Sequence, residues 1–352
     1  MAAQKVVISK DLKADLQAFF ASMSYDKLFI LTDTNTQEKC YPLIKDIPAL
    51  QDTPVITVQA GDTHKEQVAY IWSRLSNEGA SRNSLLVNLG GGMITDMGGF
   101  AGATFKRGLR TVNIPTTLMA SVDAAVGGKT GINFNGLKNE VGSFYPPECV
   151  FIDCEFLRTL DRDNLLSGYA EMIKHALISS MDIYASVLLF DLDAKIDYAF
   201  LNRMVAQSVA VKERIVEEDP KEHGIRKALN FGHTIGHAYE SLSFKKDRPL
   251  LHGHAVAAGI VSELYLSHKV CGFPMEKLSQ VVYYLKEYYP AFVFDCKDYD
   301  TLYELMTHDK KNEAGIINFT LLSQVGDVQI NQQVSKEKIL ESLDFYRESF
   351  GV

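Results

Sequence analysis

The alternation of short apolar segments with amphipathic ones over the first 150 residues is the feature that most restricts the fold. Runs of β-branched or aliphatic residues, each followed by a polar or glycine turn, predict strands at 27–32, 54–58, 85–89 and 111–114. Helical spacing lies between them, as in residues 67–75. Strands that alternate with helices favour a mostly parallel sheet covered on both faces, whose ligands bind at the carboxyl ends of the strands.

After about Cys154 the pattern becomes helical. Amphipathic spacing predicts helices at 163–180, 200–217, 227–241, 253–267 and 275–288, and one further strand signal lies at 316–322. We therefore expect an α/β fold. An N-terminal domain over 1–154 would carry a Rossmann-like, mostly parallel sheet, and an all-α domain over 155–352 would follow it.

Charge and composition exclude several classes of protein. Lys and Arg number 36 against 44 Asp and Glu, a net charge of −8, which disfavours broad binding to nucleic acid or to an anionic membrane. The longest clean apolar run, about 255–261, is far short of the ~20 residues that span a bilayer. Residues 1–13 are charged and contain no signal-peptide core. Five scattered cysteines without CxxC spacing predict a reduced, cytoplasmic protein without disulfides.

A glycine turn, Gly90-Gly91-Gly92, directly follows the strand predicted at 85–89. Glycine lets the backbone approach a pyrophosphate closely, and a helix that begins there offers free N–H groups. The spacing is not GxGxxG, so a dinucleotide cradle and a plain strand-to-helix turn both fit. Asp96 and Asp33 are candidates for a ribose hydroxyl, although each also suits a helix start.

Two later turns also carry polar groups. Thr116 and Thr117 follow the strand predicted at 111–114, where hydroxyls can contact a ligand or cap a helix. Residues 127–131 (GGKTG) resemble the end of a P-loop but lack the upstream glycine at Walker spacing, which excludes a P-loop NTPase. Lys129 in this turn remains a good ligand for an anion.

Histidines and one carboxylate suggest a metal site. Glu171 shares a helix face with Lys174 and His175, and His233 and His237 form another i,i+4 pair. His252 and His254 follow in Leu-His-Gly-His. A carboxylate with two imidazoles and an open position suits a catalytic Zn²⁺ or a similar ion. The HxxxH spacing lacks the glutamate of a zincin protease, and spacing alone does not choose among the five histidines.

Basic residues gather around the same motifs and suggest a phosphate or carboxylate on the substrate. They are Arg107, Lys129, Lys138, Lys174, Lys212, Arg226, Lys310 and Lys311. For Lys212 and Lys310 taken singly, a solvated charged face is the favoured interpretation.

Taken together, these motifs resemble the 3-dehydroquinate synthase family of sugar phosphate cyclases. The stretches that carry the resemblance run in the family's order from about Asp33 to Lys311: GGGMITDMGGFAGATFKRG, PTTLMASVDAAVGGKTGIN, GLKNEVGSFYPP, GYAEMIKHALI, RKALNFGHTIGHAYE and LHGHAVAAG. Two positions depart from the family. His254 stands where the family usually has glutamate, and Thr95 stands where glycine is commoner.

The resemblance implies NAD and one divalent metal ion, Zn or Co, as cofactors. It places NAD contacts at Asp33, Asn35, Asp62, Lys65, Gly91, Gly92, Asp96, Thr116, Thr117, Lys129, Lys138 and Thr159. The implied metal ligands are Glu171, His233 and His252. Catalytic roles would fall on Asp123, Lys129, Lys174, Lys212 and His237, and substrate contacts on Arg107, Asn139, Arg226, Asn230 and Lys310, with Arg107 reaching the site of the partner in a homodimer. Either Lys310 or Lys311 could be the ligand.

The reaction that the resemblance implies converts 3-deoxy-D-arabino-heptulosonate 7-phosphate to 3-dehydroquinate and phosphate. NAD oxidises C5 transiently, phosphate leaves by β-elimination, the hydride returns, and an intramolecular aldol step closes the ring. A cyclase for a sugar phosphate without a carboxylate, a metal-dependent alcohol dehydrogenase and a non-catalytic NAD-binding scaffold are the alternatives. The Lys and Arg cluster favours 3-dehydroquinate synthase over these alternatives, because the carboxylate and the phosphate of its substrate both need cations.

Overall fold

The computed structural model describes residues 4–61, 65–135, 137–307 and 317–352, with the side chains of 137 and 138 left out. The chain divides into two compact units. The first comprises Met1–Asp161 with Tyr198–Val209, and the second comprises Arg162–Asp197 with Ala210–Val352. Helix α7 (Tyr198–Glu218) contributes to both. Among the described residues, no helix combines the length and the apolarity that crossing a lipid bilayer requires.

The first unit is built on a parallel sheet of six strands in the order β1-β8-β5-β4-β2-β3. The strands are β1 (Lys5–Ile8), β2 (Leu28–Asp33), β3 (Val55–Val58), β4 (Leu85–Gly90), β5 (Arg110–Pro115) and β8 (Cys149–Ile152). Every residue of β2 and β4 is buried, as expected for central strands covered on both faces. The predicted parallel α/β sheet is therefore confirmed, and β1 and β8 extend it beyond the four strands expected.

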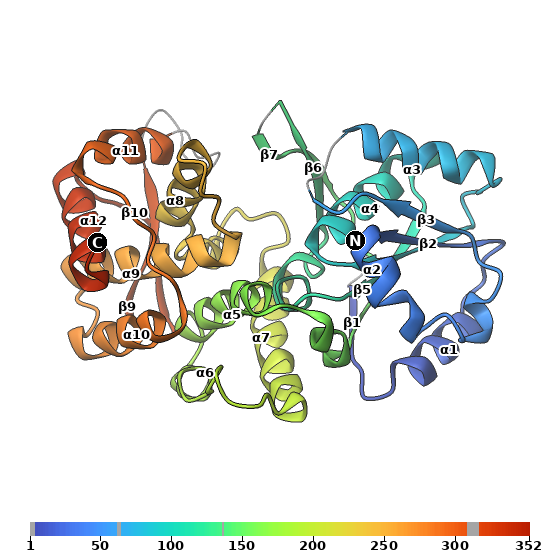
Figure 1. The fold of residues 1–352 in the computed structure, drawn as a ribbon, viewed down its shortest axis with the longest axis horizontal. Coiled ribbons are helices and arrows are strands. Elements are labelled where there is room, and N and C mark those ends of the chain that lie inside the picture. Colours follow the sequence, from blue (N-terminus) through green and yellow to red (C-terminus); the bar gives the residue numbers. More distant parts are fainter. Residues whose placement is uncertain (1–3, 62–64, 136, 308–316) are drawn as a thin grey trace. The chain divides into compact units, whose positions relative to one another are not determined.

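Helices cover both faces of this sheet. Helix α1 (Leu12–Ser22) packs Leu16 and Phe20 against one face. Helices α3 (Lys65–Asn77) and α4 (Gly92–Thr104) pack against the other, and Figure 1 shows α1 and α3 on opposite sides. Helix α2 (Thr34–Lys39) and an antiparallel hairpin, β6 (Lys129–Phe134) with β7 (Leu137–Phe144), complete the unit, together with a π-helical turn at Ala120–Ala124 and short 3₁₀ turns.

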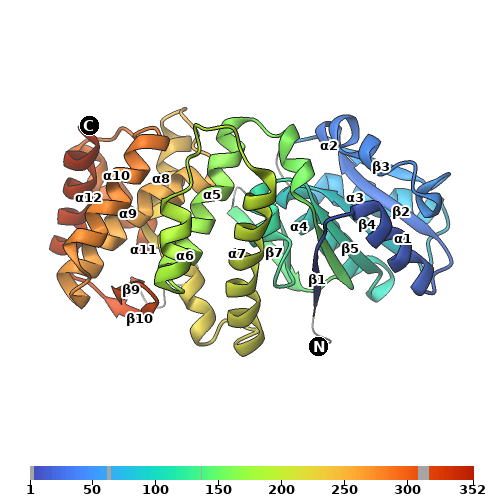
Figure 2. The ribbon, with the colours of Figure 1, turned by 90° about the horizontal axis from the view of Figure 1, so that it is seen from below.

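The second unit is mainly helical, as predicted. Its helices are α5 (Arg162–Leu177), α6 (Met181–Leu188), the end of α7, α8 (His233–Lys245), α9 (His252–Cys271), α10 (Met275–Tyr288), α11 (Tyr299–Thr307) and α12 (Lys336–Phe350). A hairpin of β9 (Asn318–Gln324) and β10 (Asp327–Gln333) is added to them and lies at one end of the helices (Figure 2). The sequence predicted its first strand only.

One predicted helix, 227–241, is wrong as a continuous element. The chain forms a 3₁₀ turn at Ile225–Asn230 and then begins α8 at His233. Gly232 separates the two with a φ of 78°, a left-handed conformation that glycine adopts without strain and that no α-helix contains. The break sets the direction of α8 relative to the preceding 3₁₀ turn, and therefore the position of His233 at the start of this helix.

Candidate functional site

Three neighbouring strands end in the polar residues that the sequence singled out. Strand β2 ends at Asp33, β4 at Gly90 before Gly91 and Gly92, and β5 at Pro115 before Thr116. The strands are adjacent in the order β5-β4-β2, and the Thr116 N–H continues the ladder by donating to the Gly90 carbonyl at 3.0 Å. These residues therefore share one edge of the sheet, which is where parallel sheets bind ligands.

The glycine turn leaves no space for side chains. Gly91 precedes α4 as its cap and has no side chain to bond the first N–H groups. A Cβ on Gly91 would lie 3.0 Å from the Thr117 Cγ2, and one on Gly92 would lie 3.2 Å from the Ala124 Cβ. Glycine thus avoids crowding against Thr117 and Ala124, and the free N–H groups at the start of α4 are of the kind that bind an anionic group.

Several of the polar residues at this edge also hold the local chain. The Asp33 Oδ1 accepts the Asn35 and Thr36 N–H groups at 2.8 and 2.9 Å and caps α2. The Thr117 Oγ1 accepts the Ala120 N–H at 3.1 Å, and the Thr159 hydroxyl donates to the Phe156 carbonyl at 2.7 Å. The cap uses only one oxygen of the Asp33 carboxylate. The structure is therefore compatible with both roles that the sequence left open, a helix cap and a ligand for a ribose hydroxyl.

The remaining candidates of the first unit lie on its periphery. Lys129 begins β6 after Gly127 and Gly128, both of positive φ, and its side chain is exposed. Other exposed candidates are Asn35, Lys65, Arg107 and Asn139, and Asp96 and Asp123 are half-buried. Asp62 and Lys310, like Lys311, fall outside the described residues, and so does the side chain of Lys138.

A charged pair lies in the interior of the second unit. Glu171 and Lys174, one turn apart on α5, are 0% and 1% exposed, and their side chains form an ion pair. Burial raises the pKa of the Glu171 carboxyl, but the positive charge of Lys174 beside it opposes this effect, and the pKa of Glu171 lies well below its usual range. A buried carboxylate of this kind requires positive charge around it.

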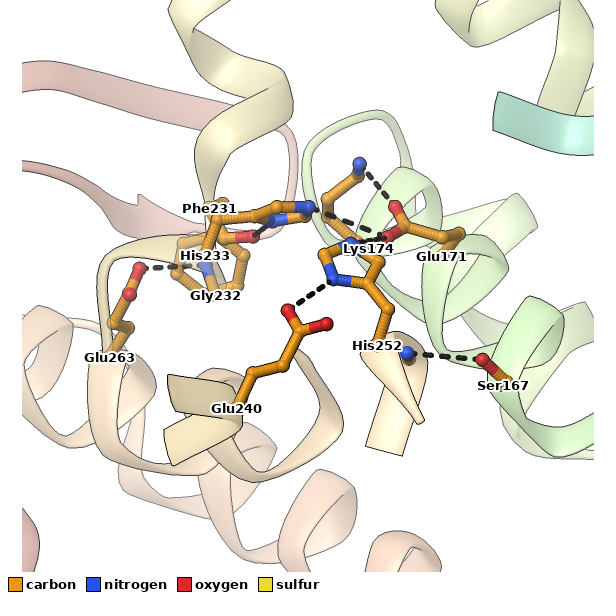
Figure 3. A network of polar contacts seen from close by, with 10 residues as sticks. Ser167, Glu171, Lys174, Phe231, Gly232, His233, Glu240, His252 and Glu263 are labelled. Carbon is orange, nitrogen blue, oxygen red and sulfur yellow. Dashed lines mark hydrogen bonds and ion pairs between the residues drawn. The ribbon is translucent and has the colours of Figure 1, made fainter. Parts of the chain in front are cut away.

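The imidazoles of His233 and His252 each turn their Nε2 atom toward the Glu171 carboxylate (Figure 3). The His233 Nδ1 lies 3.1 Å from the Phe231 carbonyl, and the His252 Nδ1 lies 2.9 Å from the Glu240 Oε2. Because both neighbours are acceptors, each Nδ1 carries a hydrogen, and in a neutral ring the Nε2 then presents its lone pair. Burial lowers the pKa of the His233 imidazole to about 3, which keeps this ring neutral.

The lone pairs converge on one point. The Glu171 Oε1 lies 3.4 Å from the His233 Nε2 and 3.7 Å from the His252 Nε2. Among the described residues this oxygen has no hydrogen bond. One carboxylate oxygen and two imidazole nitrogens that face one another without a proton between them repel each other, and a cation removes that repulsion. The donor set is the one that Zn²⁺ and related ions prefer.

Of the five histidines that spacing left open, the structure brings three together. His237 joins His233 and His252, with ring centroids 5.3 and 5.6 Å away and ligand atoms of all three within 4.8 Å. A ring nitrogen of His175 is within the same 4.8 Å of a Glu171 oxygen. His254 is buried and packs its ring edge-on against Tyr289 at 5.5 Å.

The basic candidates of this unit are buried. Arg226 is 2% exposed and donates from Nη1 to the Pro220 carbonyl at 2.7 Å, while Lys212 on α7 is 6% exposed. The Asn230 amide donates to the Glu222 carboxylate at 3.0 Å. Burying a cation costs free energy unless anions or hydrogen bonds around it offset the loss of water.

Sequence reasoning missed the residues that hold these ligands. The Gly253 N–H donates to the Ser167 hydroxyl at 3.1 Å and ties the start of α9 to α5, one turn before Glu171. A Cβ on Gly253 would lie 1.8 Å from the Ser167 carbonyl oxygen. Helices α8 and α9 meet equally closely, since a Cβ on Gly259 would lie 2.1 Å from the Gly232 carbonyl oxygen and 2.6 Å from the Gly236 nitrogen.

The contact at Gly253 gives a direct prediction. Gly253→Ala should force α9 away from α5, destabilise the protein by at least ~2 kcal/mol and weaken metal binding, because His252 moves with the helix start. Gly272→Ala is the matched control at the other end of α9, where an added Cβ meets nothing within 4 Å and the cost is backbone strain alone. Denaturant unfolding and Zn²⁺ titration measure both effects, and equal Zn²⁺ affinity of the two variants would contradict the prediction.

Comparison with known proteins covers nearly the whole chain. A family model described as 3-dehydroquinate synthase N-terminal matches residues 55–167, and one described as 3-dehydroquinate synthase C-terminal matches residues 168–312. A 3-dehydroquinate synthase of Parabacteroides distasonis is 81% identical over 100% of both chains. One of Pyrococcus furiosus is 38% identical over 96% of this chain and 98% of its own.

Solved structures share the architecture at lower identity. The 2-epi-5-epi-valiolone synthase of Streptomyces hygroscopicus subsp. jinggangensis, with NAD⁺ and Zn²⁺ bound, has a TM-score of 0.88 at 24% identity and covers 99% of this chain and 98% of its own. A 2-deoxy-scyllo-inosose synthase complexed with carbaglucose-6-phosphate, NAD⁺ and Co²⁺ has a TM-score of 0.83 at 23% identity, with 98% and 96% covered. At these identities the likeness concerns the fold.

Proposed function

Since this chain belongs to the 3-dehydroquinate synthase family, we propose an assignment of its residues to the reaction of that family. The enzyme is a carbon–oxygen lyase acting on a phosphate. It converts 3-deoxy-D-arabino-heptulosonate 7-phosphate to 3-dehydroquinate and phosphate, a step of the shikimate pathway. The observation that carries the assignment is the convergence of Glu171, His233 and His252 on one point.

These three residues would hold a divalent ion, Zn²⁺ or Co²⁺, and the structural relatives with those ions support the choice. When bound, the ion would supply Lewis-acid polarisation of the C5 oxygen of the substrate, and NAD would supply the reversible hydride acceptor. The buried Lys174 ammonium keeps Glu171 charged, and Glu240 fixes the His252 tautomer by accepting its Nδ1–H.

The nucleotide would lie at the sheet edge of the first unit. The backbone at Gly91 and Gly92 and the start of α4 would accept the pyrophosphate, and Asp33 would bind a ribose hydroxyl with the oxygen that does not cap α2. The further contacts proposed for NAD are Asn35, Asp62, Lys65, Asp96, Thr116, Thr117, Lys129, Lys138 and Thr159. The exclusion of side chains from the glycine turn is the observation that supports this placement.

The cations would hold the two anionic groups of the substrate. Lys129, Arg226 and Lys310 would bind the carboxylate and the phosphate, and Arg107, Asn139 and Asn230 would add contacts. Lys174, Lys212, His237 and Asp123 would orient hydroxyls or move protons, with the His237 imidazole close enough to the metal ligands to take a proton from a neighbouring hydroxyl. Phosphate can leave once C5 is a ketone, because the ketone acidifies the C6–H bond.

A single assay tests this function. The enzyme is incubated with the heptulosonate phosphate and NAD⁺, and phosphate release is measured against net NADH. We expect many equivalents of phosphate per enzyme and no accumulation of NADH, because the hydride returns within each turnover. Net NADH without phosphate would instead identify a dehydrogenase. Release of phosphate from sedoheptulose 7-phosphate or glucose 6-phosphate at an equal rate would identify a different cyclase.

We also propose that the enzyme acts as a homodimer in the cytoplasm. The exposed Arg107, held at a φ of 67°, would reach the substrate of the partner subunit, and size-exclusion chromatography with light scattering tests the assembly. All five cysteines are described and unpaired, which suits a reducing compartment.

A further inference from the structure

A second fully buried carboxylate, Glu263 of α9, contacts the start of α8, the helix that carries the proposed metal ligand His233. Glu263 of α9 is 0% exposed. Its Oε2 accepts the Gly232 N–H at 2.6 Å (Figure 3), and its Oε1 accepts the Ile235 N–H at 2.9 Å. A carboxylate is retained in such a place only where hydrogen bonds offset the loss of water.

These two N–H groups belong to the first turn of α8. A helix leaves its first N–H groups without partners inside the helix, and a side chain at the cap position normally accepts one of them. Here the cap position is Gly232, which has no side chain and makes no side-chain cap hydrogen bond. Glu263 supplies the missing acceptors from the neighbouring helix, and its negative charge lies at the positive end of α8.

The two contacts lie on either side of His233. One N–H precedes this residue and the other follows it by two positions, so the carboxylate fixes the backbone from which the imidazole extends. The orientation of the His233 ring is fixed by the hydrogen bond between its Nδ1 and the Phe231 carbonyl, which belongs to the same short segment. The direction of the His233 Nε2 toward Glu171 therefore depends on residues 231–235 keeping one conformation.

We propose that Glu263 is a positioning residue for the metal ligand His233, a role that rests on the proposed function of Glu171, His233 and His252. It holds the first turn of α8 in the conformation that directs the His233 Nε2 at the metal. Glutamine cannot replace it. One amide oxygen would satisfy one N–H, and the amide NH₂ would then face the other N–H as a second donor.

The test compares two substitutions of adjacent residues on α9 in the full chain. Glu263→Gln disturbs the first turn of α8. Ser262→Ala removes another buried contact between the same two helices, the 2.9 Å hydrogen bond between the Ser262 and Tyr239 hydroxyls, farther along α8. Both variants should melt at a lower temperature. Zn²⁺ affinity, measured by competition with a chromophoric chelator, should fall about tenfold or more for Glu263→Gln and stay at the wild-type value for Ser262→Ala.

The outcomes separate the two proposals. Wild-type Zn²⁺ affinity in Glu263→Gln, or an equal loss in both variants, would overturn the positioning role while leaving the metal site intact. Failure of the wild-type chain to bind one Zn²⁺ would overturn the proposed function, and the inference with it. If Glu263→Gln yields no folded protein, Glu263→Asp replaces it. This variant keeps the charge but reaches less far, so its affinity should lie below that of the wild type, and an unchanged affinity would count against the role.

Discussion

Replacing His252 with alanine should reduce Zn²⁺ affinity and turnover on the order of a thousandfold each, because one of the three proposed protein ligands disappears. The change removes the Nε2 that lies 3.7 Å from the Glu171 Oε1 and leaves Glu240 without the ring that it orients. Chelator competition measures affinity, and phosphate release measures turnover. Adding excess Zn²⁺ should restore little activity, since the ion would be held by two ligands in an altered geometry.

His268→Ala is the matched control for this variant. His268 lies on the same helix α9, is partly buried, and its Nδ1 lies 2.8 Å from the Phe273 carbonyl. The control therefore also removes one imidazole and one main-chain contact, but it should keep the Zn²⁺ affinity and the activity of the wild type. Comparable losses in both variants would show that the helix, and not the ligand, is responsible.

Lys129→Ala should lower kcat/KM by roughly a hundredfold to a thousandfold, because it removes the cation that we propose to bind an anionic group of the substrate. The expected change in stability is small, since the Lys129 side chain is exposed at the start of β6. Steady-state phosphate release and thermal unfolding, measured on the same preparation, test both halves of this prediction. Lys129→Arg should recover part of the rate, because it keeps the charge but not the compact ammonium.

Lys13→Ala provides the comparison. Lys13 is an exposed lysine of the same unit, 2.7 Å from Asp46 in an ion pair, and its removal deletes one positive charge far along the sequence from the glycine turns. Exposed pairs of this type contribute ~1 kcal/mol or less. If Lys129→Ala and Lys13→Ala both turned over substrate at nearly the wild-type rate, the proposed role of Lys129 in the site would be contradicted.

The parts of the fold that periodicity encodes could be predicted. Helix α10 begins and ends where amphipathic spacing placed it, and strands β2 and β4 lie within a residue of the apolar runs that predicted them. The break at Gly232 could not be predicted, because the spacing of apolar residues continues through the 3₁₀ turn and into α8. A left-handed glycine leaves no periodic signal.

The same limit applies to the candidate site: some of its residues could be found from the sequence, and the residues that hold them in place could not. Spacing could pair Glu171 with His175 and His233 with His237, since each pair lies on one helix face, but it could not select the ligands among the five histidines. Ser167 contacts Gly253 across 86 positions, and Glu263 contacts Gly232 across 31. Only the folded chain brings such pairs together. Along the sequence, Glu240 and Glu263 look like ordinary acids on helices.

The close approach of α8 and α9 has a consequence for how this enzyme can evolve. The backbones touch at Gly232, Gly236 and Gly259, so no side chain of any size fits between the two helices. His233 and His252 are carried by those helices, one on each. A saturation library at Gly259 should consequently yield few active clones, and we expect substitutions in this region to be tolerated mainly on the outward faces of the pair. Surface residues can therefore be replaced, whereas the contact between α8 and α9, which sets the distance between the His233 and His252 imidazoles, should tolerate no larger residue.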